Sequence, residues 1–137
     1  MEPLYTAVAT ANGRDGRTVS SDGQLDLKLA FPPALGGDGN GTNPEQLFAA
    51  GYAACFASSL GVVSRSAKVD TRDISVTAEV GIGKDTDGGF ALSVRLRVHI
   101  PESQDNATSR ELVEKAHVRC PYSKATRGNI SVDLIVE

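Results

Sequence analysis

The two cysteines of this sequence, Cys55 and Cys120, are its candidate nucleophiles, and their surroundings differ. Cys55 follows two alanines in an uncharged, apolar stretch, whereas Cys120 directly precedes Pro121. A thiol beside a cation ionises to a nucleophilic thiolate, and a second thiol can capture the oxidised form as a disulfide. Two cysteines in 137 residues do not make a disulfide-rich secreted scaffold. The number of cysteines alone is compatible with three roles: inert buried residues, metal ligands or a redox pair.

A metal site is the natural alternative to a redox pair. His117 and Cys120 have the close spacing of half a zinc site, with Cys55 and His99 as candidates for the other half. Cys55 and His99 do not have the close sequence spacing of a second pair of zinc ligands. His99 also falls in an alternating segment, where surface exposure is the usual outcome. We therefore expect no bound metal, and on the residues alone both inert buried cysteines and a redox pair remain open.

The segment that carries Cys55 is predicted to be a long helix. Thr42 or Asn43 can cap it, Pro44 suits its first turn, and Glu45 follows Thr42 at capping-box spacing. No charged residue occurs over 46–63, so we expect this helix to be buried on most sides.

A second helix is predicted over 109–119, and it should end at Cys120. The residue before a proline is pushed out of the helical region, which places this limit at Pro121. The last carbonyl groups of a helix lack partners, so a residue at this point can face a cavity rather than pack in regular structure. Cys120 could then reach Cys55, and a sulfenic acid on one would condense with the other.

The remaining elements are predicted to be strands of antiparallel sheet, because apolar residues alternate along them and turn residues separate them. An opening meander of three strands, a later hairpin and a final strand are expected over 4–10, 17–20, 24–31, 74–81, 90–100 and 130–136. The glycine-rich segment 36–41 is expected to be a mobile loop. Together with the two main helices, these strands predict an α+β fold.

Composition favours one compact domain over residues 1–137. A net charge of −3 and a pI near 5.4 provide no basic surface for nucleic acid. The amino terminus lacks the basic and apolar regions of a secretion signal. The helix around Cys55 is marginally long enough to span a membrane, but its serines and glycines and the following Arg65 and Lys68 favour a core helix. We therefore expect a cytoplasmic protein that binds neither nucleic acid nor membrane.

Three blocks of the sequence carry a family resemblance. They are the turn Gly13-Arg14-Asp15-Gly16, the block GTNPEQLFAAGYAACF from Gly41 to Phe56, and the block CPYSKATRGN from Cys120 to Asn129. They resemble the signature blocks of the organic hydroperoxide resistance (Ohr) branch of the OsmC/Ohr family. The second and third blocks are long and specific, and the resemblance spans nearly the whole chain.

The resemblance implies an α+β fold with antiparallel sheets around two central helices, in an intertwined homodimer. An active site would lie at each end of the subunit interface. In that site Cys55 would be the peroxidatic cysteine and Cys120 the resolving cysteine, with Arg14 and Glu45 around the reactive thiolate. Arg17 competes for the arginine's role, but the family's arginine falls in the Gly-Arg-Asp-Gly turn, which favours Arg14.

Electrostatics supports these roles. A guanidinium beside Cys55 would lower the pKa of its thiol and bind the peroxide oxygens, and Glu45 would hold Arg14 through a bidentate pair. Without the resemblance, Glu45 would more readily be a helix-capping carboxylate. Glu45 and Cys55 lie about 15 Å apart along a straight helix, so they cannot meet within it. Either Glu45 anchors Arg14 from a distance, or both come from the partner subunit; we favour the second.

The activity implied by the resemblance is reduction of alkyl and fatty-acid hydroperoxides to alcohols. Cys55 would form a sulfenic acid and then a disulfide with Cys120, which dihydrolipoamide or a lipoylated protein would reduce, with no bound cofactor. The apolar stretch around Cys55 suits organic peroxides better than hydrogen peroxide. Two alternatives are an OsmC-type peroxidase of broader substrate range, and a non-catalytic redox sensor or apolar-ligand binder on the same fold.

Overall fold

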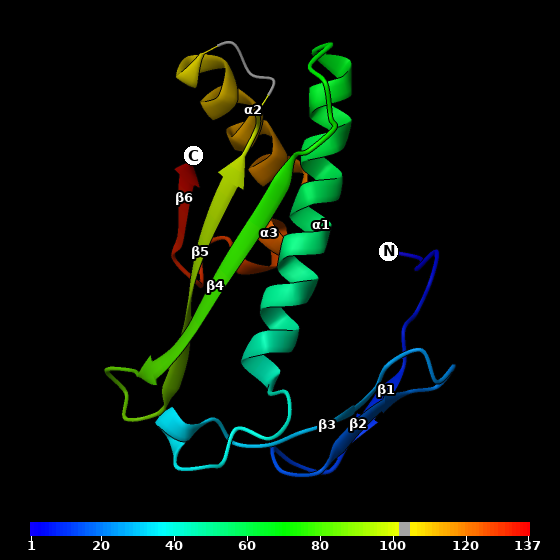
Figure 1. The fold of residues 1–137 in the computed structure, drawn as a ribbon, viewed down its shortest axis with the longest axis vertical. Coiled ribbons are helices and arrows are strands. Elements are labelled where there is room, and N and C mark those ends of the chain that lie inside the picture. Colours follow the sequence, from blue (N-terminus) through cyan, green and yellow to red (C-terminus); the bar gives the residue numbers. More distant parts are fainter. Residues whose placement is uncertain (102–104) are drawn as a thin grey trace. The chain divides into compact units, whose positions relative to one another are not determined.

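The computed structural model describes residues 1–101 and 105–137 (Figure 1), and the chain forms two compact units, residues 1–47 and 48–137. In chain order the elements are β1 (Ala9–Ala11), β2 (Arg17–Ser20), β3 (Asp26–Lys28), the short 3-10 helix η1 (Pro33–Leu35), α1 (Pro44–Ser66), β4 (Ser75–Lys84), β5 (Phe90–His99), α2 (Asn106–Arg119), α3 (Pro121–Thr126) and β6 (Val132–Val136). The predicted α+β class is confirmed. That residues 1–137 form a single domain stays a prediction.

The first unit is built on a three-stranded antiparallel sheet with strand order β1-β2-β3, which confirms the predicted meander. Its first strand is shorter than predicted, because pairing with β2 begins only at Ala9, opposite Ser20. The turn between β1 and β2 needs glycine at Gly13, whose φ is +138°, and it carries Arg14.

The glycine-rich segment closes against the end of β3. The Thr42 N–H donates to the Lys28 carbonyl at 2.9 Å, and the Ala30 N–H donates to the Thr42 carbonyl at the same distance. A Cβ on Gly41 would lie 2.8 Å from the Lys28 carbonyl oxygen, so glycine permits this close approach. The mobility of residues 36–41 stays a prediction.

The second unit contains a mixed sheet with strand order β4-β5-β6. The predicted hairpin is confirmed as β4 and β5, which pair antiparallel from Ser75 opposite His99 to Lys84 opposite Phe90. The final strand is also confirmed, but β6 runs parallel to β5, so the expectation of purely antiparallel sheets is wrong here. The chain returns to the same end of the sheet through α2 and α3, and such a crossover produces a parallel neighbour.

One face of this sheet packs on α1 and α2 to form the core (Figure 1). The buried side chains come from one face of each element: Tyr52, Phe56 and Leu60 of α1, Val94, Leu96 and Val98 of β5, and Leu112, Val113 and Ala116 of α2. The period of two in β5 and the helical spacing in α1 and α2 produce these faces.

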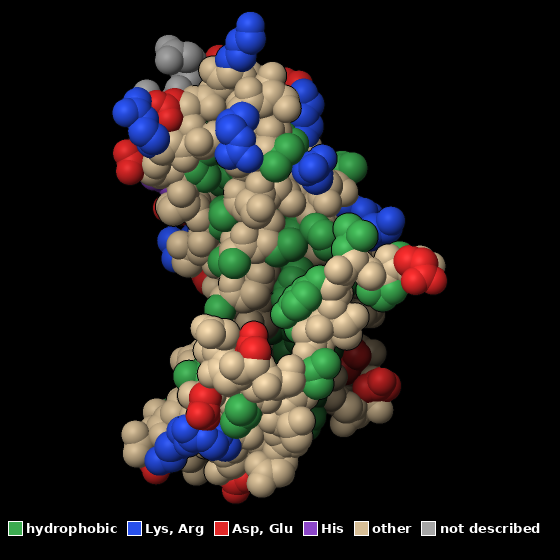
Figure 2. All heavy atoms as spheres, turned by 90° about the vertical axis from the view of Figure 1, so that its right-hand side faces the viewer, with side chains coloured by type: hydrophobic (Ala, Val, Ile, Leu, Met, Phe, Trp, Pro, Cys, Tyr) green, Lys and Arg blue, Asp and Glu red, His purple; other side chains and the backbone are tan. Residues whose placement is uncertain are grey.

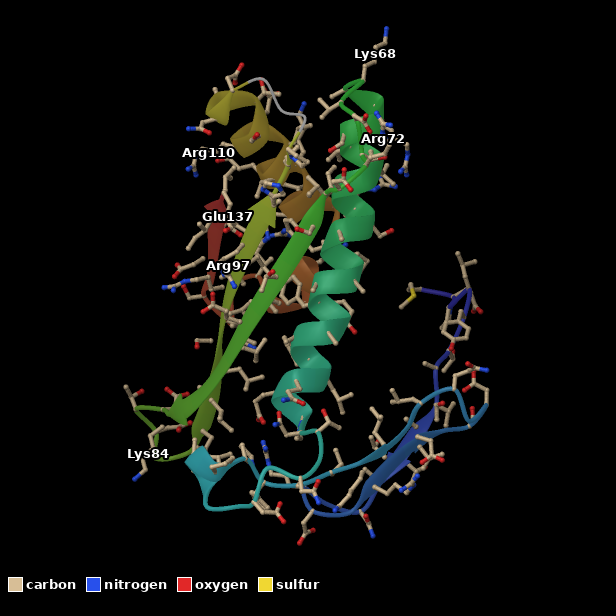
Figure 3. All side chains as sticks on the ribbon, viewed as in Figure 1. Lys68, Arg72, Lys84, Arg97, Arg110 and Glu137 are labelled. Atoms are coloured by element: carbon tan, nitrogen blue, oxygen red, sulfur yellow. The ribbon has the colours of Figure 1, made fainter. Side chains whose placement is uncertain are left out.

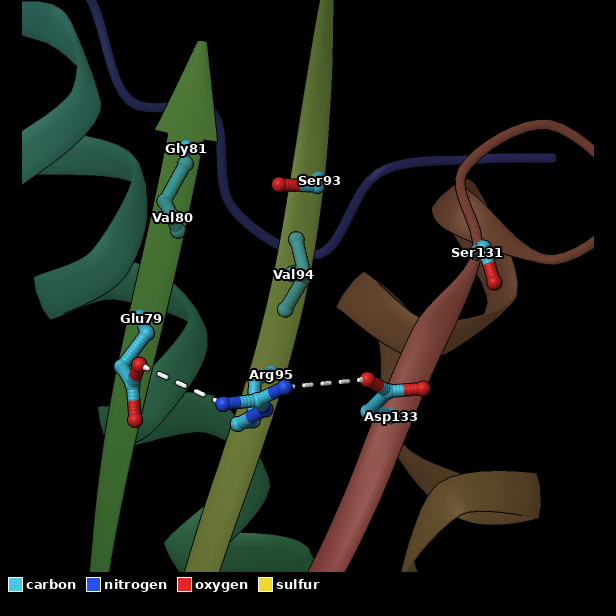
Figure 4. Close-up of a pocket in the computed structure, with 8 residues that line it drawn as sticks. All are labelled: Glu79, Val80, Gly81, Ser93, Val94, Arg95, Ser131 and Asp133. Carbon is cyan, nitrogen blue, oxygen red and sulfur yellow. Dashed lines mark ion pairs between the residues drawn. The ribbon is translucent and has the colours of Figure 1, made fainter.

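The opposite face of the sheet is polar and carries ion pairs across its strands. Arg95 lies between Glu79 of β4, at 4.0 Å, and Asp133 of β6, at 3.6 Å (Figure 4). Arg97 also pairs with Glu79, at 2.8 Å, and points toward Glu137, at 3.7 Å (Figure 3). These exposed pairs each contribute up to about 1 kcal/mol and favour this strand register.

The expectation that α1 is buried on most sides is wrong for a single chain. Its buried side chains lie along one face, whereas the row at every fourth position is exposed: Gln46, Ala50, Ala54 and Ser58. By length and composition α1 could span a membrane, with 28% of its apolar window buried. The core helix of a soluble fold passes the same test, and the buried face of α1 joins such a core.

The helix ends follow the sequence signals. Asn43 caps α1, since its Oδ1 accepts the Gln46 N–H at 2.8 Å. Helix α2 starts three residues before the predicted position and ends at Arg119, which confirms the predicted limit at Cys120. Cys120 has extended backbone angles, and α3 begins directly after it at Pro121. The sequence reasoning missed α3.

Candidate active site

The two cysteines lie close together in the second unit. Cys55 is on α1 and Cys120 is at the junction of α2 and α3, and their sulfurs are 3.6 Å apart. Both thiols are free; Cys55 is half-buried and Cys120 is fully buried. A small movement would bring the two sulfurs to bonding distance. The two thiols can therefore act as a dithiol–disulfide couple.

The surroundings of Cys55 in the second unit disfavour its thiolate. Burial is the main cause that raises the pKa of the Cys55 thiol, and the neighbouring Cys120 raises it further. The backbone N–H of Tyr122 opposes these effects by donating a hydrogen bond to the sulfur. A thiolate at this position requires a further positive group.

Cys55 opens into a hollow of about 490 Å³. The residues that line it are Cys55, Ser58, Ser59, Val62, Arg119 and Pro121. Small side chains on α1 leave this space beside the sulfur. The lining is partly polar, so the apolar pocket expected from the sequence is only partly present.

A buried hydrogen-bond network holds the segment around Cys120 against α1. The Tyr52 hydroxyl lies 2.8 Å from Ser123 Oγ and 3.2 Å from Thr126 Oγ1, and Ser123 Oγ lies 2.8 Å from His117 Nδ1. These contacts connect α1, α2 and α3. Sequence reasoning missed the network, although Ser123 and Thr126 belong to the block CPYSKATRGN that carried the family resemblance.

His117 is part of this network through its contact with Ser123. Burial lowers the pKa of the His117 imidazole, and the positive charge of Arg127 lowers it further, so both effects favour the neutral ring. His99 lies on the exposed face of β5. Within residues 1–101 and 105–137, no three His, Cys, Asp or Glu side chains gather as metal ligands.

Tyr52→Phe is expected to lower the free energy of unfolding by about 1–3 kcal/mol, because Ser123 and Thr126 lose a buried partner. Urea denaturation measures this loss. Tyr122→Phe is the matched control, since Tyr122 is partly exposed and its hydroxyl has no hydrogen-bond partner among the described residues. Equal losses in both variants would contradict a structural role for the network.

Gly51 allows Tyr122 to lie against α1 beside Cys55. A Cβ at Gly51 would be 2.6 Å from the Tyr122 hydroxyl oxygen and 3.2 Å from the ring. The ring also packs against Phe48 and Tyr52, with centroids 6.3 Å and 5.6 Å away. This packing keeps the Tyr122 N–H near the sulfur of Cys55.

The first unit holds the second pair of candidate residues. Arg14 and Glu45 form a bidentate ion pair, with Nη1–Oε2 and Nη2–Oε1 distances of 2.9 Å and 2.6 Å. The hydrogen bonds from Arg14 are the main cause that lowers the pKa of the Glu45 carboxyl. The carboxylate of Glu45 is thus directed to Arg14, and the side chain that caps α1 at Gln46 is Asn43. Arg17 pairs instead with Asp26, at 2.5 Å on an exposed surface.

The four predicted site residues thus occur as two pairs, one in each unit. The thiol pair of Cys55 and Cys120 can exchange electrons, and the pair of Arg14 and Glu45 presents an oriented guanidinium. The catalytic roles of all four residues stay predictions.

The sequence matches known proteins over almost its whole length. The family described as OsmC-like protein matches residues 37–135. The chain is 54% identical over 134 residues to the organic hydroperoxide resistance protein of Xanthomonas axonopodis pv. citri (strain 306), which covers 96% of this chain and 93% of that protein.

The fold is also similar to solved structures. The organic hydroperoxide resistance protein of Elizabethkingia anophelis superposes with a TM-score of 0.93 at 50% identity, covering 100% of this chain and 99% of that one. The organic hydroperoxide resistance protein OhrB of Bacillus subtilis has a TM-score of 0.89 at 45% identity, covering 98% of this chain and 100% of that one.

Proposed function

This chain belongs to the OsmC/Ohr family, and we propose that it is a thiol peroxidase that reduces organic hydroperoxides to alcohols. The observation that carries the proposal is the 3.6 Å separation of two free thiols, one of them beside an open hollow. The relatives named above are organic hydroperoxide resistance proteins. A peroxide-reducing dithiol provides such resistance directly.

The first step is attack of the Cys55 thiolate on the terminal oxygen of the hydroperoxide. A sulfur–oxygen bond forms and the peroxide bond breaks, so Cys55 becomes a sulfenic acid and the alkoxide takes a proton to leave as the alcohol. The Cys120 thiolate then attacks the Cys55 sulfur. A disulfide forms, and hydroxide leaves and is protonated to water.

Arg14 and Glu45 are proposed to activate Cys55 from the partner subunit. Burial raises the pKa of the Cys55 thiol, and a guanidinium beside it would reverse this shift. Glu45 orients that guanidinium through two hydrogen bonds. Glu45 precedes Cys55 by ten positions on α1, about 15 Å along the axis, so a second copy is the better source of the pair.

A homodimer suits the surface of the single chain. The exposed Ala50 and Ala54 on α1 would allow another backbone to pack closely. The large apolar side chains of Met1, Leu4 and Tyr5 are also exposed in one chain. Covering both surfaces with a second copy would complete the burial that the sequence predicts for α1.

The disulfide is proposed to be reduced by dihydrolipoamide, free or on a lipoylated protein, by thiol–disulfide exchange. The cycle requires no bound cofactor or metal. It requires a reducing compartment, which fits a cytoplasmic protein that binds neither membrane nor nucleic acid.

Consumption of cumene and tert-butyl hydroperoxide by the purified protein tests the function, with hydrogen peroxide as the contrasting substrate. Dihydrolipoamide, thioredoxin and glutathione are compared as reductants. Many turnovers with dihydrolipoamide and an organic peroxide support the proposal. Equal rates with hydrogen peroxide would favour the OsmC-type alternative, and oxidation that stops after one equivalent would favour a redox sensor. No oxidation of the thiols by any peroxide would contradict the function.

A further inference from the structure

Arg119 lines the same hollow as Cys55 and has no role in the proposed cycle. It is the last residue of α2, and its side chain is exposed. Within residues 1–101 and 105–137, no acidic side chain pairs with its guanidinium, whereas Arg14 and Arg17 each pair with a carboxylate. The hollow therefore contains one uncompensated positive charge.

Arg119 is placed for recognition rather than for activation of the thiol. The pKa of the Cys55 thiol is raised, and the hydrogen bond that opposes this shift comes from Tyr122 rather than from Arg119. An arginine that shares the hollow without stabilising the thiolate can bind a more distant part of the same ligand. A planar guanidinium binds carboxylates through two parallel hydrogen bonds.

The rest of the lining suits a ligand with an apolar body and a charged end. Val62 and Pro121 provide apolar surface next to Cys55, and Ser58 and Ser59 provide small polar side chains. Figure 2 shows Lys and Arg side chains on the upper part of the molecular face that bears α1, with Asp and Glu side chains near its edges and exposed hydrophobic side chains between them. Among the described residues that line the hollow, Arg119 is the one with a charged side chain, so the hollow itself favours an anion that carries an apolar chain.

We propose that Arg119 binds the carboxylate of anionic organic hydroperoxides and makes the protein prefer them to neutral ones. The inference rests on the proposed peroxidase function and names the substrate class within it. The carboxylate would pair with Arg119 while the peroxide group at another position of the same molecule meets Cys55. Neutral alkyl hydroperoxides would still react, but without this anchor.

Arg119→Gln removes the charge and keeps a long polar side chain, and Arg110→Gln is its control. Arg110 is also exposed on α2, does not line the hollow and is labelled in Figure 3. The substrates are linoleic acid hydroperoxide, its methyl ester, both below their critical micelle concentrations, and tert-butyl hydroperoxide. In Arg119→Gln, kcat/KM for the acid should fall roughly tenfold, as expected for loss of a charged hydrogen-bonded pair.

Values for the ester and for tert-butyl hydroperoxide should be the same in wild type and Arg119→Gln, and Arg110→Gln should match wild type throughout. Added salt should weaken the preference of the wild type for the acid. An equal loss for all three substrates, or no preference of the wild type for the acid over the ester, would overturn the inference.

Equilibrium binding separates this inference from the proposed function. Titration of the resting protein with octanoate requires no turnover. Arg119→Gln should weaken octanoate binding roughly tenfold relative to wild type and Arg110→Gln. Unchanged binding overturns the carboxylate site even if the protein is a peroxidase, and weakened binding without turnover supports the site while the peroxidase function fails.

Discussion

Cys55→Ser is expected to abolish consumption of cumene hydroperoxide, with a loss of at least about 10³-fold, because a serine hydroxyl is not ionised at neutral pH. Cys120→Ser should keep the first step, since Cys55 still opens into the hollow. It should lose repeated turnover with a dithiol, since the sulfur 3.6 Å from Cys55 is absent. Stopped-flow and steady-state assays distinguish these two effects.

Mass spectrometry gives a second test of the same assignment. After one equivalent of peroxide, the wild type should lose two hydrogens as the disulfide forms. Cys120→Ser should instead gain oxygen on Cys55, and excess peroxide should add more oxygen irreversibly. The roles of the two cysteines are reversed if Cys55→Ser reacts with peroxide at Cys120 while Cys120→Ser does not react.

Arg14→Met is expected to lower kcat/KM by about 10²-fold, the usual loss when one donor to the developing charge is removed. The sign of the accompanying pH effect follows from the thiol. Burial already raises the pKa of Cys55, and loss of the guanidinium leaves only the Tyr122 N–H to oppose this shift. The alkaline rise of the rate with pH should therefore move to higher pH in the variant.

Arg17→Met is the matched control, because Arg17 lies three positions away in the same region and pairs with Asp26. It should retain the activity and the pH profile of the wild type. If Arg17→Met lost its activity and Arg14→Met kept it, Arg17 rather than Arg14 would be the arginine that activates Cys55.

Mixed dimers of Arg14→Met and Cys55→Ser subunits test whether the site is shared. If Arg14 acts on the Cys55 of its partner, one of the two sites in a mixed dimer contains both wild-type residues, and activity returns. If Arg14 acts within its own subunit, neither site is complete and the mixture stays inactive. Differently tagged, copurified subunits allow this measurement, and the separate homodimers provide the baseline.

Local signals predicted the elements well. Asn43 and Pro44 marked the start of α1, Pro121 marked the end of α2, and alternation marked both strands of the β4–β5 hairpin. These signals depend on neighbours in sequence, so they need no knowledge of the tertiary fold. The pairing of Arg14 with Glu45 needed the family resemblance, because the two residues are 31 positions apart.

Packing across long sequence separations was not predictable in the same way. Tyr52 and Ser123 are 71 positions apart, and no periodic pattern indicates that their hydroxyls meet. The parallel direction of β6 was also missed, because alternation identifies a strand and its faces but not its direction. The exposed row on α1 was missed for a similar reason. An uncharged helix has the same sequence pattern whether its own chain or a second chain covers it.

The two thiols are chemically identical, but they differ in burial. This difference would determine which of them reacts first. In the proposed cycle, an oxidant arriving from solvent would meet Cys55 at the open hollow, whereas the fully buried Cys120 would react only with the oxidised Cys55 sulfur. The same difference in burial would apply to the proposed reductant, which would attack the Cys55 sulfur and release the Cys120 thiolate as the leaving group. If the proposed cycle holds, the positions of the two thiols would direct both the oxidising and the reducing substrate to the Cys55 sulfur through the same hollow.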